Sequence, residues 1–92
     1  MRPSPDSRPR LAPGCRLSDA PGQKTMLMLP EKALRLLGPS LQIVERCDGR
    51  HTVAQIVSEL QKLYAQAKPE KVEQDILEYL ALLHEKRAVN FE

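Results

Sequence analysis

Cys47 and His51 are the first residues in this 92-residue chain whose types and spacing suggest chemistry. A thiol beside an imidazole can act as a nucleophile with its base, and both groups are also zinc ligands. Gly49 lies between them and is expected to end a helix, so the two side chains do not share a helical face. No third group that would orient the pair is evident. We therefore assign no catalytic residue and interpret Cys47 as a small buried hydrophobe.

A zinc site would need Cys15 and His84 as two further ligands. The spacing lacks the Cys-x₂₋₄-Cys and His-x₃₋₅-His pairs of structural zinc sites, so we assign no metal and no cofactor. The acidic residues at 70, 73, 75 and 78 are interpreted as the complement of a helix dipole and a solvated face rather than an acid–base pair. The four glycines are isolated and form no phosphate-binding loop. The sequence predicts that the chain is not an enzyme.

The composition also excludes other classes of function. Residues 1–25 hold five basic and two acidic residues, whereas the other 67 hold nine basic and ten acidic ones. A near-neutral body with one Phe, two Tyr and no Trp argues against nucleic acid as a partner. No apolar run approaches the roughly 18 residues of a membrane span, and no signal peptide is evident. Two cysteines make no disulfide framework, which favours the cytoplasm.

The elements that would position a site point to an α+β fold. Residues 1–10, rich in Pro and Arg, are expected to form a flexible arm, and residues 11–92 one domain. Strands are expected near 14–19, 24–29 and 32–36, with a turn at 20–23 and the third strand outermost. In the third strand, Leu34 and Leu36 are expected to point one way and residues 33 and 35 the other. Helices are expected from 39 to about 48, after the Thr52 N-cap with Gln55 closing a capping box, and from Pro69 to about 86. Residues 88–91 form either a last short strand or a tail.

This order is that of a small winged helix-turn-helix-like domain. A short N-terminal antiparallel β-ribbon precedes a three-helix bundle, and the domain would be largely helical if the ribbon were disordered or swapped. The helix at 69–86 has an apolar surface wider than one core-facing stripe, because Leu77, Ala81 and Leu82 extend it. Either the helix is nearly surrounded by its own core, or one flank lines a groove or a dimer contact.

Three stretches of the chain resemble one known family. They are residues 8–12 (Arg-Pro-Arg-Leu-Ala), 28–36 (Met-Leu-Pro-Glu-Lys-Ala-Leu-Arg-Leu) and 43–53 (Ile-Val-Glu-Arg-Cys-Asp-Gly-Arg-His-Thr-Val). Together with the apolar spacing of the two later helices, they resemble the pyrroloquinoline quinone (PQQ) biosynthesis protein D family, PqqD, over about residues 8–91. Gly38-Pro39 departs from the polar N-cap that family members often carry, which would shift the start of the first helix.

The resemblance implies a cytoplasmic peptide chaperone that belongs to the RiPP recognition elements. Such a protein binds the precursor peptide PqqA and presents it to PqqE, a radical S-adenosylmethionine enzyme that cross-links a Glu and a Tyr of the peptide. The peptide would join the third strand as an added strand, in a groove walled by the third helix. By position, the implied peptide-binding residues are Lys32, Ala33, Leu34, Arg35 and Leu36 on the strand and Val72, Asp75, Ile76, Tyr79, Leu80 and Leu83 on the helix.

The residues themselves agree with this mode, because an outer strand has unpaired N–H and C=O groups that can pair with an extended chain. Two roles stay open. Arg35 either pairs with an acidic side chain of the peptide or only keeps the edge soluble, and Asp75 either contacts the peptide or complements the helix dipole. The apolar run at residues 26–29 suggests the hypothesis of a swapped or saddle-like homodimer.

Two other functions remain as alternatives. A plain dimerisation or scaffold domain without a groove explains the wide apolar helix equally well. A DNA-binding winged helix shares the order of elements, but the helix at 69–86 offers only Lys71, Gln74 and Lys86 toward a DNA groove, among five acidic residues.

Overall fold

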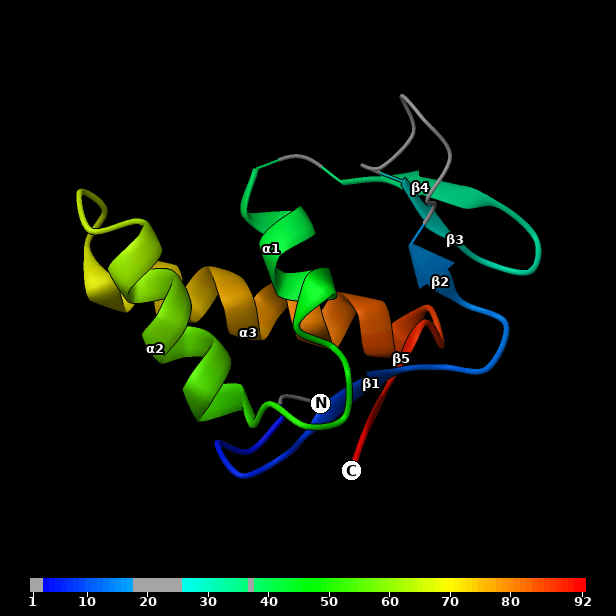
Figure 1. Cartoon of the computed structure of the whole chain (residues 1–92), viewed down its shortest axis with the longest axis horizontal. Helices are drawn as coiled ribbons and strands as arrows, with labels where there is room; N and C mark the ends of the chain where they lie inside the picture. Colours follow the sequence, from blue (N-terminus) through cyan, green and yellow to red (C-terminus); the bar gives the residue numbers. More distant parts are fainter. Residues whose placement is uncertain (1–2, 18–25, 37) are drawn as a thin grey trace.

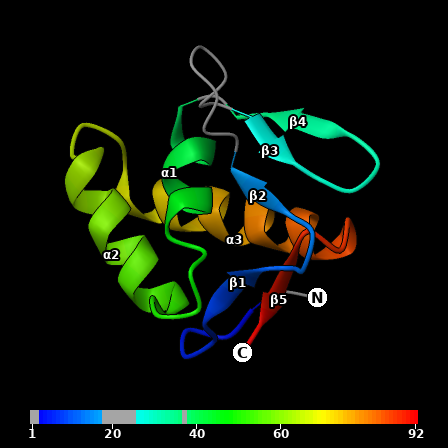
Figure 2. The same ribbon diagram turned by 45° about the vertical axis from the view of Figure 1, so that its right-hand side comes forward.

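The computed structural model describes residues 3–17, 26–36 and 38–92. Its elements run in the order β1 (Pro9–Leu11), β2 (Arg16–Leu17), β3 (Met26–Met28), β4 (Ala33–Arg35), α1 (Pro39–Glu45), α2 (Val53–Leu63), α3 (Pro69–Glu85) and β5 (Val89–Phe91). The three helices pack together, and the strands form two small antiparallel sheets. In Figures 1 and 2, α1 lies between α2 and the sheet of β2, β3 and β4, and that sheet lies toward the C-terminal end of α3. The fold class is therefore α+β, as predicted.

The first sheet has the strand order β2-β3-β4, so β4 is an edge strand, as the sequence predicted for the third strand. A two-residue turn, Pro30-Glu31, joins β3 to β4, and the backbone N–H of Leu29 donates to the carbonyl of Lys32 at 2.8 Å. The alternation of side chains is also as expected, because Leu36 is buried and Leu34 half-buried, whereas residues 33 and 35 are exposed. The expected turn at 20–23 and the adjoining ends of the first two expected strands lie outside the described residues.

The second sheet joins the two ends of the chain. β1 pairs with β5 in antiparallel register, Arg10 opposite Asn90, and the last residues therefore form a strand rather than a tail. Residues 9 and 10, which the sequence assigned to the arm, belong to β1, and Pro9 is buried. The arm also contacts the domain before β1, since the carbonyls of Pro5 and Ser7 accept hydrogen bonds from helix α2. The sequence could not indicate this pairing, because the partner strand lies some 80 residues away.

Helices α2 and α3 begin where the sequence places them. Thr52 caps α2, with Gln55 N–H donating to Thr52 Oγ1 at 3.1 Å and Thr52 N–H donating to Gln55 Oε1 at 2.8 Å. Pro39 and Pro69 occupy the first turns of α1 and α3, where a missing N–H has no cost. Helix α1 ends at Glu45, slightly earlier than expected. Among the described residues, no helix is long and apolar enough to cross a membrane.

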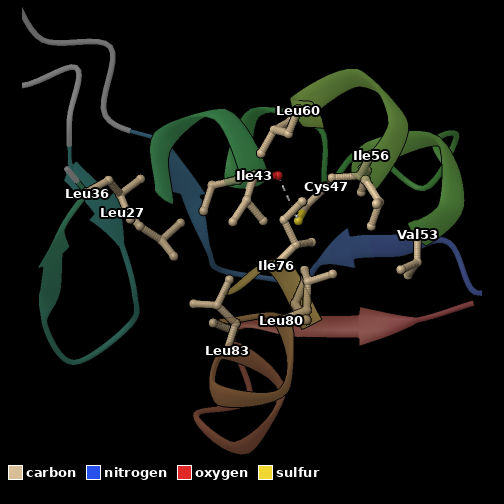
Figure 3. Packing of buried hydrophobic residues seen from close by; sticks show 14 of the residues in the cluster. Leu27, Leu36, Ile43, Cys47, Val53, Ile56, Leu60, Ile76, Leu80 and Leu83 are labelled. Atoms are coloured by element: carbon tan, nitrogen blue, oxygen red, sulfur yellow. Dashed lines mark hydrogen bonds between the residues drawn. The ribbon is translucent and has the colours of Figure 1, made fainter. Parts of the chain in front are cut away.

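The core forms where the helices meet the inner face of the first sheet (Figure 3). Leu27 of β3 and Leu36, directly after β4, extend toward Ile43 of α1. Helices α2 and α3 contribute most of the other aliphatic side chains of the core, which also includes residues 44, 88 and 89. Each fully buried Leu or Ile stabilises the fold by roughly 1.5–3 kcal/mol. Since both sheet leucines are 0% exposed, the sheet is part of the core rather than an appendage.

Candidate functional site

Strand β4 is an edge strand of its sheet in the part of the chain that the structure describes. Within the described residues, β4 pairs only with β3, in the register Met26–Arg35, Leu27–Leu34 and Met28–Ala33. In an antiparallel pair, hydrogen-bonded and non-hydrogen-bonded positions alternate. Because residues 29 and 32 are hydrogen-bonded, residues 27 and 34 form the next hydrogen-bonded pair. The N–H and C=O groups of Ala33 and Arg35 therefore point away from the sheet and can pair with another extended chain.

The side chains of this edge strand divide into two faces. Lys32, Ala33 and Arg35 are exposed, and the Arg35 guanidinium makes no ion pair with any residue that the structure describes. Leu34 is half-buried, and Leu36 lies fully in the core. An added strand would alternate in the same way, with every second side chain on the leucine face and the others beside Arg35.

The predicted helix residues separate into buried and accessible groups. Val72, Ile76, Leu80 and Leu83 all belong to the hydrophobic core and are at most 9% exposed. These four side chains therefore pack in the hydrophobic core and do not form an accessible surface on α3. Sequence spacing could not separate the core stripe from a groove wall, since both are apolar and lie on adjoining parts of the helix.

Asp75 and Tyr79 are the accessible members of the helix set. Asp75 is exposed, and its Oδ1 lies 3.4 Å from Lys71 Nζ, one turn earlier in α3. Tyr79 is half-buried. Burial raises the pKa of the Tyr79 phenol, a hydrogen bond with the Ser40 side chain lowers it, and nearby Cys47 raises it. The Ser40 contact shows that this flank of α3 faces the start of α1, directly after β4.

Leu82 extends the same flank of α3 and was absent from the predicted set. Residues 75, 79, 82 and 86 follow helical spacing, so they lie along one line on the helix. Leu82, in the last turn of α3, is 43% exposed. The sequence signal for it was the widening of the apolar surface beyond the core stripe. Tyr79 and Leu82 together give the flank an accessible apolar centre.

The strand and the helix approach each other at a cleft of about 370 Å³. The cleft is lined by residues just before β2, by the β3–β4 turn and by the end of α3. These residues are Pro13, Cys15, Leu29, Pro30, Glu31, Lys32, Lys86 and Arg87. Lys32 is the only one of the eleven predicted site residues that lines it. Neither Lys86 nor Arg87 was among the predicted peptide-binding residues.

The residues first considered for catalysis have structural surroundings. Cys47 is buried, and its thiol donates to the carbonyl of Ile43 at 3.3 Å. Burial, and then the charge of Asp48, raise the pKa of Cys47 to about 12, so the thiol is protonated at neutral pH. His51 does have carboxylate partners that the sequence did not reveal, with Nδ1 3.0 Å from Asp48 Oδ2 and Nε2 3.4 Å from Glu59 Oε2.

The other two residues of the hypothetical zinc set lie elsewhere. His84 stacks on Phe91 of β5 with ring centroids 4.8 Å apart, and Cys15 lines the cleft. In the part of the chain that the structure describes, no cluster of three or more metal-ligating side chains is present.

Comparison with known proteins reveals close relatives. The family model of coenzyme PQQ synthesis protein D (PqqD) matches residues 24–89. A PqqA binding protein of Xanthomonas axonopodis pv. citri is 36% identical over 83 residues, which cover 89% of each chain. The bifunctional coenzyme PQQ synthesis protein C/D of Methylorubrum extorquens is 39% identical over 82 residues, covering 88% of this chain and 22% of that longer protein.

A solved structure agrees with these sequence matches. The solution NMR structure of the PqqD truncation of Methylobacterium extorquens PqqCD, which represents a functional and stand-alone RiPP recognition element, has a TM-score of 0.74 and 36% identity. The match covers 96% of this chain and 94% of that one. Sequence and fold agree over nearly the whole length, and the chain belongs to the coenzyme PQQ synthesis protein D family.

Proposed function

We propose that the chain binds the precursor peptide PqqA by strand addition to β4 and presents it to the radical S-adenosylmethionine enzyme PqqE in the cytoplasm. The observation that carries this proposal is the free edge of β4, in a chain whose relatives include PqqA binding proteins. Backbone pairing through Ala33 and Arg35 would supply affinity that depends little on the peptide sequence. The side-chain contacts on either side of the edge would select the peptide.

The strand side of the proposed site is the run from Lys32 to Leu36. Lys32, Ala33 and Arg35 would contact the peptide directly, and Leu34 would contact the peptide side chains on the inner face. Leu36 would hold the strand in place from the core, since it is 0% exposed. A peptide with an apolar residue at every second position would therefore fit this edge. Acidic side chains at the other positions would meet the Arg35 guanidinium.

The helix side of the proposed site is the flank of α3 nearest to β4. Tyr79 and Asp75 are its accessible predicted residues, and we add Leu82. The buried members of the predicted set, Val72, Ile76, Leu80 and Leu83, would fix the position of that flank through the core. They would affect binding indirectly, by placing Tyr79 and Leu82.

We further propose that the chain performs no catalytic step of its own. The protonated, buried thiol of Cys47 is a poor nucleophile, and the imidazole of His51 lies between two carboxylates that hold the turn before α2. Both cysteines are free thiols, which fits a reducing compartment.

A homodimer formed by exchange of the β-ribbon is also a proposal. Leu27 and Leu36 fill the core from the ribbon, so an exchanged ribbon would have to place both side chains in the core of the partner. Light scattering that gives a monomer mass at high protein concentration would contradict it.

Amide hydrogen exchange, with and without PqqA peptide, tests the strand-addition proposal. The N–H groups of Ala33 and Arg35 should become protected when the peptide binds, whereas that of Leu34 should already be protected by β3. An NMR titration of the same sample should show shifts at residues 32–36 and along residues 75–82. If saturating peptide changes neither, the peptide-binding proposal fails, and the scaffold alternative takes its place.

A proline substitution tests the same edge by affinity. Ala33→Pro removes one outward N–H, and proline is tolerated at an edge because no ladder bond inside the sheet is lost. This variant should weaken peptide binding about tenfold. Ala33→Val keeps the N–H group and is the matched control. Equal affinities for the two variants would exclude strand addition at β4.

A further inference from the structure

The cleft between the β3–β4 turn and the end of α3 carries an excess of positive charge. Lys32, Lys86 and Arg87 line it, and Glu31 is the only acidic residue in its lining. None of the three cationic side chains forms an ion pair or a side-chain hydrogen bond with any residue that the structure describes. Three cations without such a partner among the described residues surround one cleft of about 370 Å³, which makes it a favourable environment for an anionic group.

Arg87 reaches the cleft from a backbone conformation that favours glycine. Its φ is +58°, and it is the one non-glycine residue with positive φ among the residues described. Helix α3 ends there in a Schellman motif, with Ala88 N–H donating to the Leu83 carbonyl at 2.9 Å and Arg87 N–H to the His84 carbonyl at 3.0 Å. A non-glycine residue at this position is strained, and a strained residue beside a cleft suggests a use for its side chain.

The cleft adjoins the end of the edge strand. Lys32 lines the cleft and directly precedes Ala33, the first residue of β4. A chain that pairs with Ala33 and Arg35 advances about 3.3 Å per residue, so the residues that continue beyond the paired segment past Lys32 would run toward the cleft. Their side chains would come within reach of Lys86 and Arg87.

We propose that this cleft binds the carboxylate of an acidic residue in the peptide, just beyond the segment paired with β4. The inference rests on the proposed function, and it adds a second recognition site at the end of the first. The edge strand would bind the backbone and the apolar side chains of the peptide. The cleft would bind one acidic residue of the peptide and thereby fix its register. An added strand without such an anchor could slip by two residues and keep the same pattern of faces.

The double variant Lys86→Gln/Arg87→Gly tests the cleft without threatening the fold. Glycine suits the positive φ of position 87, so the thermal midpoint should not fall on that account. Affinity for PqqA peptide should fall about two- to thirty-fold at low salt, and the difference should shrink at high salt. The matched control is Lys62→Gln/Lys68→Gln, which removes two exposed charges, one from the last turn of α2 and one from the N-cap of α3.

Cys15 gives an independent readout of location, because it lines the cleft while Cys47 is buried. In the full chain, iodoacetamide should modify Cys15, and PqqA peptide should slow that modification. A peptide whose Asp and Glu residues are replaced by Asn and Gln should bind more weakly to the wild-type protein than PqqA does. The double variant, in contrast, should bind this neutralised peptide and PqqA with nearly equal affinity.

The outcomes separate the cleft from the strand edge. If PqqA protects the Ala33 and Arg35 amides but binds the double variant as tightly as wild type, the cleft inference is wrong and the proposed function stands. Unchanged Cys15 modification in the presence of bound peptide would equally overturn it. If wild-type protein does not bind PqqA at all, the proposed function itself fails. Retention of duplex DNA that the double variant loses would assign the cleft to nucleic acid instead.

Discussion

At the scale of single residues, two leucines of α2 differ sharply in what they contribute. Leu60 is 0% exposed in the core, whereas Leu63, at the last turn of the same helix, is 54% exposed. We predict that Leu60→Ala destabilises the protein by about 2–5 kcal/mol, because it removes buried apolar volume and leaves a cavity. Leu63→Ala should change stability by less than about 0.5 kcal/mol. Urea unfolding of both variants measures the difference, and similar losses would contradict the packing of α2.

Residue types alone gave a partial account of the candidate chemistry. Cys47 was correctly interpreted as a buried hydrophobe, since an unpaired cysteine is usually buried. The partners of His51 were missed, because Glu59 reaches it from α2, one turn beyond the capping box. Ion pairs between a turn and a helix depend on side-chain directions that residue spacing does not encode.

At the scale of elements, the start of α2 shows how the arm stabilises the domain. The first N–H groups of a helix have no partner within it. The N–H of Val53 donates to the Ser7 carbonyl at 2.8 Å and that of Ala54 to the Pro5 carbonyl at 3.0 Å. The third, that of Gln55, donates to Thr52 Oγ1. Two of these three donors therefore depend on a segment that the sequence had assigned to a flexible arm.

The Thr52 cap can be tested by itself. We predict that Thr52→Ala lowers the free energy of unfolding by about 1 kcal/mol, because Gln55 N–H loses its acceptor while the two arm contacts remain. Ser58→Ala, at an exposed position in the middle of the same helix, is the matched control and should be neutral or slightly stabilising. Chemical denaturation of the two variants checks this. Equal stability of Thr52→Ala and wild type would show that the arm alone caps the helix.

The sequence predicted the elements with local signals and missed those without them. The capping box at Thr52 and the proline at 69 located two helices, and alternation over 32–36 located the edge strand. The pairing of β1 with β5 was missed, because it depends on contacts between the two ends of the chain. Proline content suggested disorder at 1–10, yet a proline carbonyl accepts hydrogen bonds as well as any other, and Pro5 uses it to cap α2.

The candidate site was predictable on its strand side and less so on its helix side. Period-two alternation placed Leu34 and Leu36 on one face of the strand and Ala33 and Arg35 on the other, and in the structure the leucines form the inner face. On α3, the resemblance implied Ile76 and its apolar neighbours as peptide-binding residues, and the structure buries their side chains in the core. Only the packing of α1 against one flank shows which apolar residues of α3 stay accessible, and packing between helices is a property of the fold rather than of spacing.

At the scale of the whole molecule, one turn connects several parts of the fold. Asp48 lies between α1 and α2, and its backbone forms an isolated antiparallel β-bridge with Arg10 of β1. Its side-chain Oδ1 accepts hydrogen bonds from the backbone N–H groups of Arg50 and His51. Desolvation raises the pKa of Asp48. The hydrogen bonds from Arg50 and His51 together outweigh this effect and lower that pKa from its ordinary 3.8 to about 2. The folded protein thus favours the ionised carboxylate.

This shift predicts how acid acts on the protein. Because the pKa of Asp48 is lower in the folded state than in the unfolded one, the charged carboxylate stabilises the fold fully above about pH 4 and progressively loses that effect as the pH falls toward 2. Wild-type protein should therefore be more stable than Asp48→Asn at pH 7, and the difference should shrink between pH 4 and 2. Thermal unfolding of both proteins across this range measures it. Asp75→Asn removes an exposed carboxylate whose one ion-pair partner among the described residues is Lys71; it is the matched control and should show a smaller change. A difference between wild type and Asp48→Asn that stays constant down to pH 2 would mean that the hydrogen bonds at Asp48 do not depend on its charge.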